Sequence, residues 1–277
     1  MRRAPRAAGD ARACAGRDAH IPADGGAKRG PAVTTSERQT GDPAAKAPTG
    51  QAVWLRDLLL IALTFASGAV DAISYFGLGK TFSAFMTGNI VFLGFGIANI
   101  KGPALLPVIC ALSAFAVGSY LGMWVATVRS EEPGLWPRRV SVLLALVAIA
   151  EAAFLAVWLA TAGQPSPAIA VVLIVLSSLA MGIQTATVRS LGVQGVFTTA
   201  GTFTLVALTE TFAGSRPRAE MPRLAGVLVG LVAGAIGGGL LFLHARSYAP
   251  AMTLVITILV ILLGRRLDSR RLSTGRQ

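Results

Sequence analysis

Long apolar stretches are the feature that most constrains how this chain can fold. Five of them reach the length of about 20 residues that an α-helix needs to cross a bilayer, and they are Leu58–Gly79, Ala104–Val128, Val140–Thr161, Ala168–Thr187 and Leu224–Leu243. A sixth, Met252–Gly264, reaches this length when Tyr248–Pro250 is added. Backbone groups in the hydrocarbon layer must be hydrogen-bonded within the protein, which helices achieve. We therefore predict an all-α integral membrane protein.

Two shorter apolar segments leave the number of crossings open. Phe82–Ala98 and Val196–Ala213 each contain about 18 residues, roughly 27 Å as a helix, and each is rich in Gly or Thr. We expect six to eight hydrophobic helical segments, in which these two either cross the membrane or re-enter it as broken segments.

The chain contains a weak internal repeat. Phe65–Val91 and Leu179–Thr204 align with one gap, and the matches are Ala66/Ala180, Gly68/Gly182, Ala72/Ala186, Leu78/Leu191, Gly79/Gly192 and Gly88/Gly201. This predicts two similar halves, residues 55–161 and 167–264. Duplicated halves with Gly-interrupted hydrophobic segments are typical of transporters.

The distribution of basic residues favours one topology. If all eight segments cross with the N-terminus inside, 11 of the 17 Lys and Arg residues from position 46 onward lie inside. If the two short segments return to the side they entered from, 14 lie inside and 3 outside. The second arrangement fits the positive-inside bias better and makes the halves inverted repeats. The difference depends on Arg129, Arg138 and Arg139.

Composition excludes several classes of protein. The chain is 53% hydrophobic and 14% charged, whereas soluble domains are about 25% charged. The net charge of +12 comes from the two ends and the short loops, as expected for basic flanks of membrane spans and not for a nucleic-acid interface. We predict a protein of the bacterial cytoplasmic (inner) membrane with both termini cytoplasmic.

The two ends of the chain differ from its apolar middle. Residues 1–52 contain no aromatic residue and no periodic apolar face, which predicts a disordered basic cytoplasmic tail. A misassigned start codon and a tail that binds lipid headgroups are alternatives. We assign residues 53–264 to the helical transmembrane domain and 265–277 to a basic C-terminal tail.

Polar side chains within the apolar stretches of the first half are candidates for a binding site. Asp71 lies about 13 residues into the first stretch, where a carboxylate costs a few kcal/mol unless it is paired, hydrated or protonated. Thr87 and Asn89 flank Gly88, which could open a helix and free carbonyl groups for a ligand. The alternative roles are hydrogen bonds between helices and, for Gly88, close packing.

In the second half the primary candidates are Gln184 and Thr202. We expect them to complete a substrate or ion site together with Asp71, Thr87 and Asn89. The secondary candidates are Glu151 and Glu210, as protonatable groups, and Arg189, either as a counter-ion or extended toward the interface. Successive small-xxx-small spacings predict helix packing at Gly68, Gly88, Gly182, Gly201, Gly226, Gly230 and Gly234.

Motifs of enzymes and cofactor sites are absent from the sequence. It contains no GxSxG, HExxH or Walker A motif, and His20 and His244 have no metal-ligand partners at useful spacing. We therefore predict no catalytic residues, no metal and no cofactor.

The residues assembled so far resemble the YoaK-like family of bacterial inner-membrane proteins, a domain of unknown function. The resemblance covers roughly Leu55–Gly264, and its motifs are Gly68-Asp71-Ala72, Met86-Thr87-Gly88-Asn89, the pattern from Gly182 to Gly192, and Gly201-Thr202. The chain departs from the family at Thr185 and Ala200, where Asn and Thr are usual. The resemblance implies an integral membrane protein and leaves the activity open.

We expect a small protein, similar to a secondary transporter or a channel, that moves a small solute or ion. The alternative is a scaffold that does not transport and packs against other membrane proteins through Gly-rich helix faces. The expected partners are the lipid bilayer, a small molecule or ion, and a second copy of the chain, with no nucleic acid.

Overall fold

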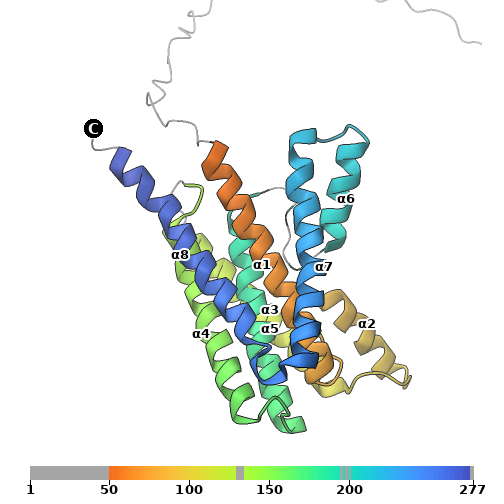
Figure 1. Ribbon diagram of the computed structural model, residues 1–277. Helices are drawn as coiled ribbons and strands as arrows, with labels where there is room; N and C mark the ends of the chain where they lie inside the picture. The colour runs from red at the N-terminus through yellow and green to blue at the C-terminus, as the bar shows by residue number, and fades with distance from the viewer. Residues whose placement is uncertain (1–49, 129–133, 194–195, 197–198, 200, 275–277) are drawn as a thin grey trace, which may run out of the picture. The chain divides into compact units, whose positions relative to one another are not determined.

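The computed structural model describes residues 50–128, 134–193, 196, 199 and 201–274. All regular structure in these residues is helical (Figure 1). The α-helices are α1 (Gly50–Gly77), α2 (Met86–Ile97), α3 (Leu105–Val128), α4 (Arg138–Ala160), α5 (Pro167–Ser190), α6 (Gly201–Phe212), α7 (Met221–His244) and α8 (Ala251–Thr274). Six of them, all except α2 and α6, are long and apolar enough to cross a membrane. The predicted all-α membrane fold is confirmed.

The helices extend beyond the predicted domain at both ends. Helix α1 begins at Gly50, and α8 continues to Thr274 through the residues predicted to be a basic tail. A helix is held by hydrogen bonds within its own backbone, so α8 need not end where its apolar residues end. The predicted disordered tail lies outside the described residues, apart from its last three positions.

The two halves contain the same elements in the same order. A long helix is followed by a helix of 12 residues and then by two long helices, both in α1–α4 and in α5–α8. The turns after α1 and α5 contain Gly79 and Gly192, aligned partners in the repeat, and both have a positive φ of 86° and 65° respectively. That conformation is readily available to glycine. The sequence repeat therefore corresponds to a structural repeat.

The halves run in opposite directions. Leu59, in the first half of α1, shares a core cluster with Val188, near the end of α5. Ile73, near the end of α1, shares another cluster with Ile174, near the start of α5. Helices α1 and α5 are therefore antiparallel, and the halves are inverted repeats.

The short helices α2 and α6 do not cross. Gly118 of α3 lies against Leu179 of α5, and Gly122 lies against Ala186, so α3 is parallel to α5. Because α5 is antiparallel to α1, α3 begins on the side where α1 ends, and the segment that contains α2 returns to that side. By the same logic, α7 is parallel to α1, because Asp57 and Arg223 pair near their starts. A helix of 12 residues spans about 18 Å, against about 30 Å for the hydrocarbon layer. The arrangement with six crossings is thus the one that the structure has.

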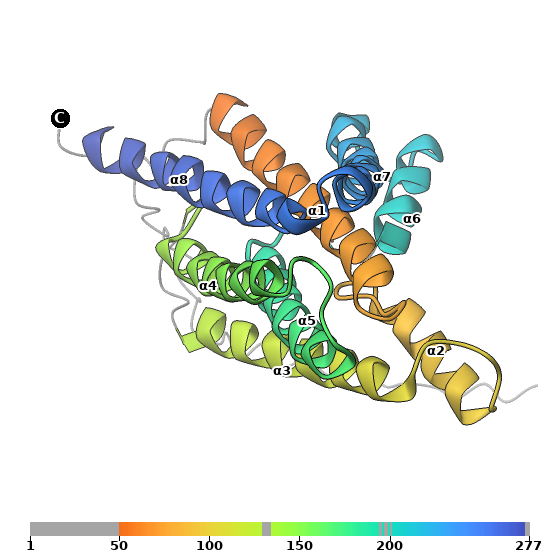
Figure 2. The same ribbon diagram turned by 60° about the horizontal axis from the view of Figure 1, so that its bottom comes forward.

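The eight helices form two layers, each containing helices from both halves (Figure 2). One layer has the order α6, α7, α1, α8, and the other has the order α2, α3, α5, α4. Exchanging the halves converts one layer into the other. The layers meet mainly through α4 with α8 and through α1 with α5.

Glycines set the closest approaches within each layer. A Cβ at Gly68 would overlap the carbonyl oxygen of Leu231 in α7, and one at Gly182 would overlap that of Phe115 in α3. Gly234 lies in the same way against Phe65. Backbones that approach this closely gain van der Waals contact, which drives helix association in membranes.

Candidate functional site

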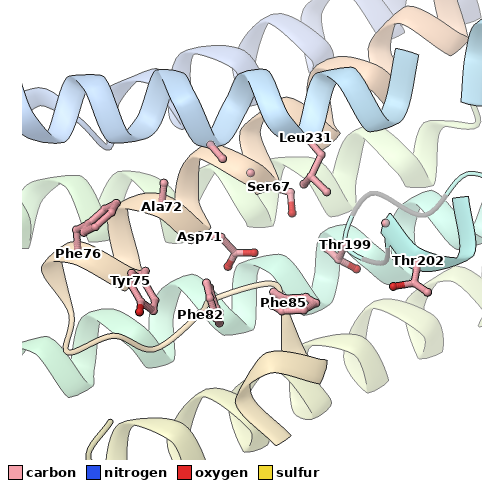
Figure 3. Close-up of a pocket in the computed structure, with 13 residues that line it drawn as sticks. Ser67, Asp71, Ala72, Tyr75, Phe76, Phe82, Phe85, Thr199, Thr202 and Leu231 are labelled. Atoms are coloured by element: carbon pink, nitrogen blue, oxygen red, sulfur yellow. The ribbon is translucent and has the colours of Figure 1, made fainter. Parts of the chain in front are cut away.

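A cavity of about 450 Å³ lies between α1, α7, the turn that precedes α2, and Thr199 with the start of α6 (Figure 3). It is the place where the starts of both short segments come together. The residues that line it are Ser67, Gly68, Asp71, Ala72, Tyr75, Phe76, Phe82, Phe85, Thr199, Gly201, Thr202, Leu231 and Ala235.

Helix α1 contributes one face to the cavity. Ser67, Asp71 and Tyr75 are spaced four residues apart and therefore lie on one side of the helix. The close contact between Gly68 and α7 limits the cavity on the opposite side. The positions four residues before and four residues after Asp71 are the pattern by which the sequence could have identified Ser67 and Tyr75.

Asp71 holds the turn that leads into α2. Its Oδ1 atom accepts hydrogen bonds from the backbone N–H groups of Ser83, at 2.9 Å, and Ala84, at 2.7 Å. Phe85 N–H also interacts with the carboxyl. Backbone N–H groups ahead of a helix N-terminus stabilise a negative charge, so this turn can compensate for burying the carboxylate. Asp71 is half-buried and faces the cavity.

Asn89 holds the same turn from its other side. Phe82 N–H donates to the Asn89 Oδ1 atom at 3.1 Å, and Asn89 Nδ2 donates to the Phe82 carbonyl at 2.7 Å. Asn89 is fully buried and does not line the cavity. Its structural effect is to position Phe82, whose ring does line it. The hydroxyl of Ser83 adds a link to Ser177 of α5 at 2.7 Å.

Aromatic rings form one wall of the cavity. Phe82 stacks on Tyr75 with ring centroids 5.1 Å apart and makes an edge contact with Phe85 at 5.3 Å. Phe92 of α2 stacks on Phe82 from behind, at 5.8 Å. This ladder gives the rings a fixed orientation. Sequence analysis missed these aromatic residues, because only the folded turn brings Phe82 and Phe85 beside α1.

The second half contributes hydroxyl groups. Thr199 Oγ1 lies 3.0 Å from the Oγ1 atom of Thr185, the aligned partner of Asp71. Thr202, the partner of Asn89 in the Gly88/Gly201 register, is exposed to the cavity. In the sequence, Thr199 belongs to a hydroxyl-rich stretch around Gly201 that is the counterpart of Thr87 and Asn89 around Gly88. Thr198 of the same stretch lies outside the described residues.

The structure therefore brings Asp71 and Thr202 together at one cavity but not the other three primary candidates. Thr87 is exposed on α2 and does not line the cavity. Gln184 is fully buried, and its Nε2 donates to the Leu63 carbonyl at 3.2 Å. Gln184 thus joins α5 to α1.

The secondary candidates lie away from the cavity. Glu151 is 6% exposed on α4, and its carboxyl group interacts with the Thr257 hydroxyl of α8. Arg189 is exposed in the last turn of α5. Glu210 pairs with Arg216, and this hydrogen bond raises the pKa of the Arg216 guanidinium above its ordinary value. Glu210 thus belongs to an ion-pair cluster at the end of α6, where it is partly exposed.

The predicted packing glycines all make contacts within the chain. Gly226 and Gly230 lie against Ile61, Gly88 lies against Phe85, and Gly201 lies against Leu231. Gly68, Gly182 and Gly234 make the backbone contacts described above. Among the residues that the structure describes, no three His, Cys, Asp or Glu side chains group as a metal site.

Comparison with known proteins gives a family match over most of this fold. The family model described as protein of unknown function (DUF1275) matches residues 59–264. The chain is similar to the UPF0700 transmembrane protein YoaK of Bacillus subtilis (strain 168), with 37% identity over 161 residues that cover 57% of this chain and 68% of YoaK. No solved structure matches.

Proposed function

This chain belongs to the DUF1275 family of transmembrane proteins, and from that premise we propose that it is a small-solute transporter whose binding site is the cavity at Asp71. The role is not enzymatic, and the protein works in the bacterial cytoplasmic membrane. Both termini face the cytoplasm, because the six-crossing topology then leaves 14 of 17 basic residues inside.

One observation supports the proposal above the others. The starts of two inverted, short re-entrant segments meet at a single cavity, which also contains a carboxyl group from the last third of the chain's first span. Substrate sites of inverted-repeat transporters lie where discontinuous segments of the two halves meet. A carboxyl group inside a span is costly and is usually retained for function.

The two layers suggest how the cavity opens. Helices α1 and α7 in one layer, and α3 and α5 in the other, touch backbone to backbone through glycines, so each pair moves as a unit. The turn with Phe82 and Phe85 connects α1 in the first layer to α2 in the second. A rocking of one layer against the other would therefore change the width of the cavity. Such motion exposes a fixed site to alternate sides of the membrane.

The scaffold alternative depends on glycine-rich faces that remain available to partners. The glycines of α7 at positions 226, 230, 234 and 238 instead lie against α1 of the same chain. A helix face already filled by a neighbouring helix is not available to another protein. This observation favours transport over the scaffold.

Cysteine accessibility tests the proposal without a known substrate. In a background in which Cys14 and Cys110 are replaced by Ser and Ala, a cysteine at Thr202 probes the cavity. A cysteine at Val229, 67% exposed on the apolar face of α7, is the matched control. In right-side-out and inside-out vesicles, we expect a membrane-impermeant thiol reagent to modify T202C from both sides and V229C from neither.

Modification of T202C from one side alone, or from neither, would count against alternating access. A second measurement compares uptake of a solute panel into proteoliposomes of the wild type and Asp71→Asn, under proton and sodium gradients. Equal uptake by the two proteins would show that the Asp71 carboxyl group takes no part in transport. Absence of uptake of any solute by the wild type would contradict the transporter.

A further inference from the structure

We propose that the cavity at Asp71 selects a monovalent organic cation with an apolar or aromatic body. This inference rests on the proposed binding function of the cavity and adds the chemical class of its ligand. It follows from the charge, the aromatic wall and the size of the cavity.

The charges around the cavity exclude an anion. Asp71 is the ionisable acid among the lining residues that the structure describes, and none of them is Lys, Arg or His. The remaining polar groups are hydroxyls, such as those of Ser67 and Thr202, which carry no charge. An anion placed here would lie beside a carboxyl group with no cation to compensate, at a large cost in a region of low dielectric.

The aromatic wall adds attraction for a cation. Tyr75, Phe82 and Phe85 lie together in the cavity lining, and the stacked and edge contacts among them fix their rings. Aromatic faces attract alkylammonium groups through their quadrupole, and cages of such rings recognise quaternary ammonium ligands. The same rings favour an apolar ligand body, which an inorganic ion lacks.

An inorganic cation fits the cavity poorly. Ca²⁺ takes six to eight oxygen ligands, and Mg²⁺ requires a near-octahedral shell, whereas the lining supplies one carboxyl group and a few hydroxyls. The volume of about 450 Å³ corresponds to about 15 water molecules at about 30 Å³ each. That space suits a ligand the size of a small organic molecule, within the range of about 300–1,000 Å³ for small-molecule sites.

The carboxyl group is held ready for a cation before binding. The N–H groups of Ser83 and Ala84 both bond to the Oδ1 atom and fix the side-chain torsions. Figure 3 shows Asp71 projecting from α1 toward the side on which Phe85 and Thr199 lie. A preset carboxyl group loses little conformational entropy on binding, which strengthens the interaction. Asp71 therefore both supports the turn and provides the charge.

A matched pair of probes tests the assignment. Benzyltrimethylammonium has the predicted features, and neopentylbenzene is its neutral isostere with carbon in place of nitrogen. Benzenesulfonate serves as the anionic probe. Binding to the full chain in zwitterionic lipid nanodiscs is measured by calorimetry, with empty nanodiscs as the blank. We expect the cation to bind at least about tenfold more tightly than the isostere, and the anion not to bind.

Three variants test the charge of Asp71, the aromatic ring of Phe82 and, as a control, a buried acid away from the cavity. Asp71→Asn keeps an oxygen acceptor for the turn but removes the charge, and we expect it to weaken cation binding about tenfold or more. Phe82→Leu keeps an apolar side chain without a ring, and a loss of a few-fold is expected. Glu151→Gln makes the same acid-to-amide change in the membrane away from the cavity, and it should bind like the wild type.

Several results would overturn the assignment. Equal affinity for the cation and the neutral isostere would mean that the cavity is merely apolar. Unchanged cation affinity in Asp71→Asn would show that the charge of Asp71 does not contribute to recognition of the cation. Absence of cation binding by a protein that transports another solute would overturn the ligand class and leave transport intact. Cation binding by a protein whose T202C is not modified from both sides would overturn transport and leave the ligand class intact.

Discussion

The two re-entrant turns occupy equivalent positions in the repeat but are held in different ways. In the first half, the Asp71 carboxyl group accepts two backbone N–H bonds, and the Asn89 carboxamide makes two more bonds to Phe82. In the second half, threonines replace both side chains, and the side-chain bond between described residues is Thr185 to Thr199. A hydroxyl is shorter and makes fewer bonds than a carboxylate or carboxamide.

This difference explains why a symmetric fold has an asymmetric cavity. In the first half, the strongest polar side chains hold the backbone of the turn and thereby present the rings of Phe82 and Phe85. In the second half, the smaller polar side chains of Thr199 and Thr202 reach the cavity themselves. A duplicated scaffold can therefore supply an apolar wall from one copy and a polar wall from the other.

The largest expected effect concerns the glycine contacts between helices, which are equivalent in the two halves. Gly68→Ala and Gly182→Ala each place a methyl group against a backbone carbonyl of a neighbouring helix. We expect both variants to lose about 3 kcal/mol of unfolding free energy, by similar amounts, because overpacked backbones must separate. Gly239→Ala, where nothing lies within 4 Å, is the control and should change little. Unfolding in detergent micelles measures all three, and an unequal loss at the two equivalent sites would contradict equal packing.

The next effect separates the two turns. Asp71→Ala removes the acceptor for the Ser83 and Ala84 N–H groups, and we expect exchange of these amides to accelerate by about a hundredfold, equivalent to about 2.7 kcal/mol of lost hydrogen bonding to a charged acceptor. Asp71→Asn keeps an acceptor and should accelerate them less. Hydrogen–deuterium exchange with mass spectrometry detects the change. In the second half, Thr185→Val should affect exchange in its own turn less than Asp71→Ala affects the first. Equal effects would show that the two turns are held equally.

The smallest expected effect compares Asn89 with its aligned partner Thr202. Asn89→Ala leaves both backbone groups of Phe82 without their buried partner, and we expect a loss of about 2 kcal/mol of unfolding free energy. Thr202→Ala removes an exposed hydroxyl and should cost less than about 0.5 kcal/mol. Chemical denaturation of both variants under one set of conditions is the measurement. A loss in Thr202→Ala as large as that in Asn89→Ala would mean that Thr202 holds its turn as Asn89 does.

Local sequence features predicted the framework well. Apolar length located the six spans, and the charge bias favoured the six-crossing, inverted arrangement that the structure has. The matches at Gly79/Gly192 identified equivalent turns, because a left-handed backbone strongly favours glycine. Asp71 stood out because a carboxyl group inside a span is rare.

The composition of the candidate site was predicted less well. Asn89 and Gln184 are polar residues in apolar surroundings, as a ligand contact would be, but both bond to the backbone of the protein itself. Phe82 gave no signal in the sequence, since an aromatic ring is common in a membrane span, and nothing in the sequence separated Thr199 from the other threonines around Gly201. Their positions depend on how the turns fold back against α1.

The sequence by itself determined that this chain is a helical membrane protein built from two related halves, and it favoured six spans over eight. Helix length, charge and glycine positions are local properties, and each can be assessed within a single segment of the sequence. The tertiary structure alone decided which polar groups face a cavity and which hold the backbone. That outcome depends on distances between the α1 face and segments that are 12 or 13 residues away, at Ser83 and Ala84, or more than 120 residues away, at Thr199, and no local pattern records such distances.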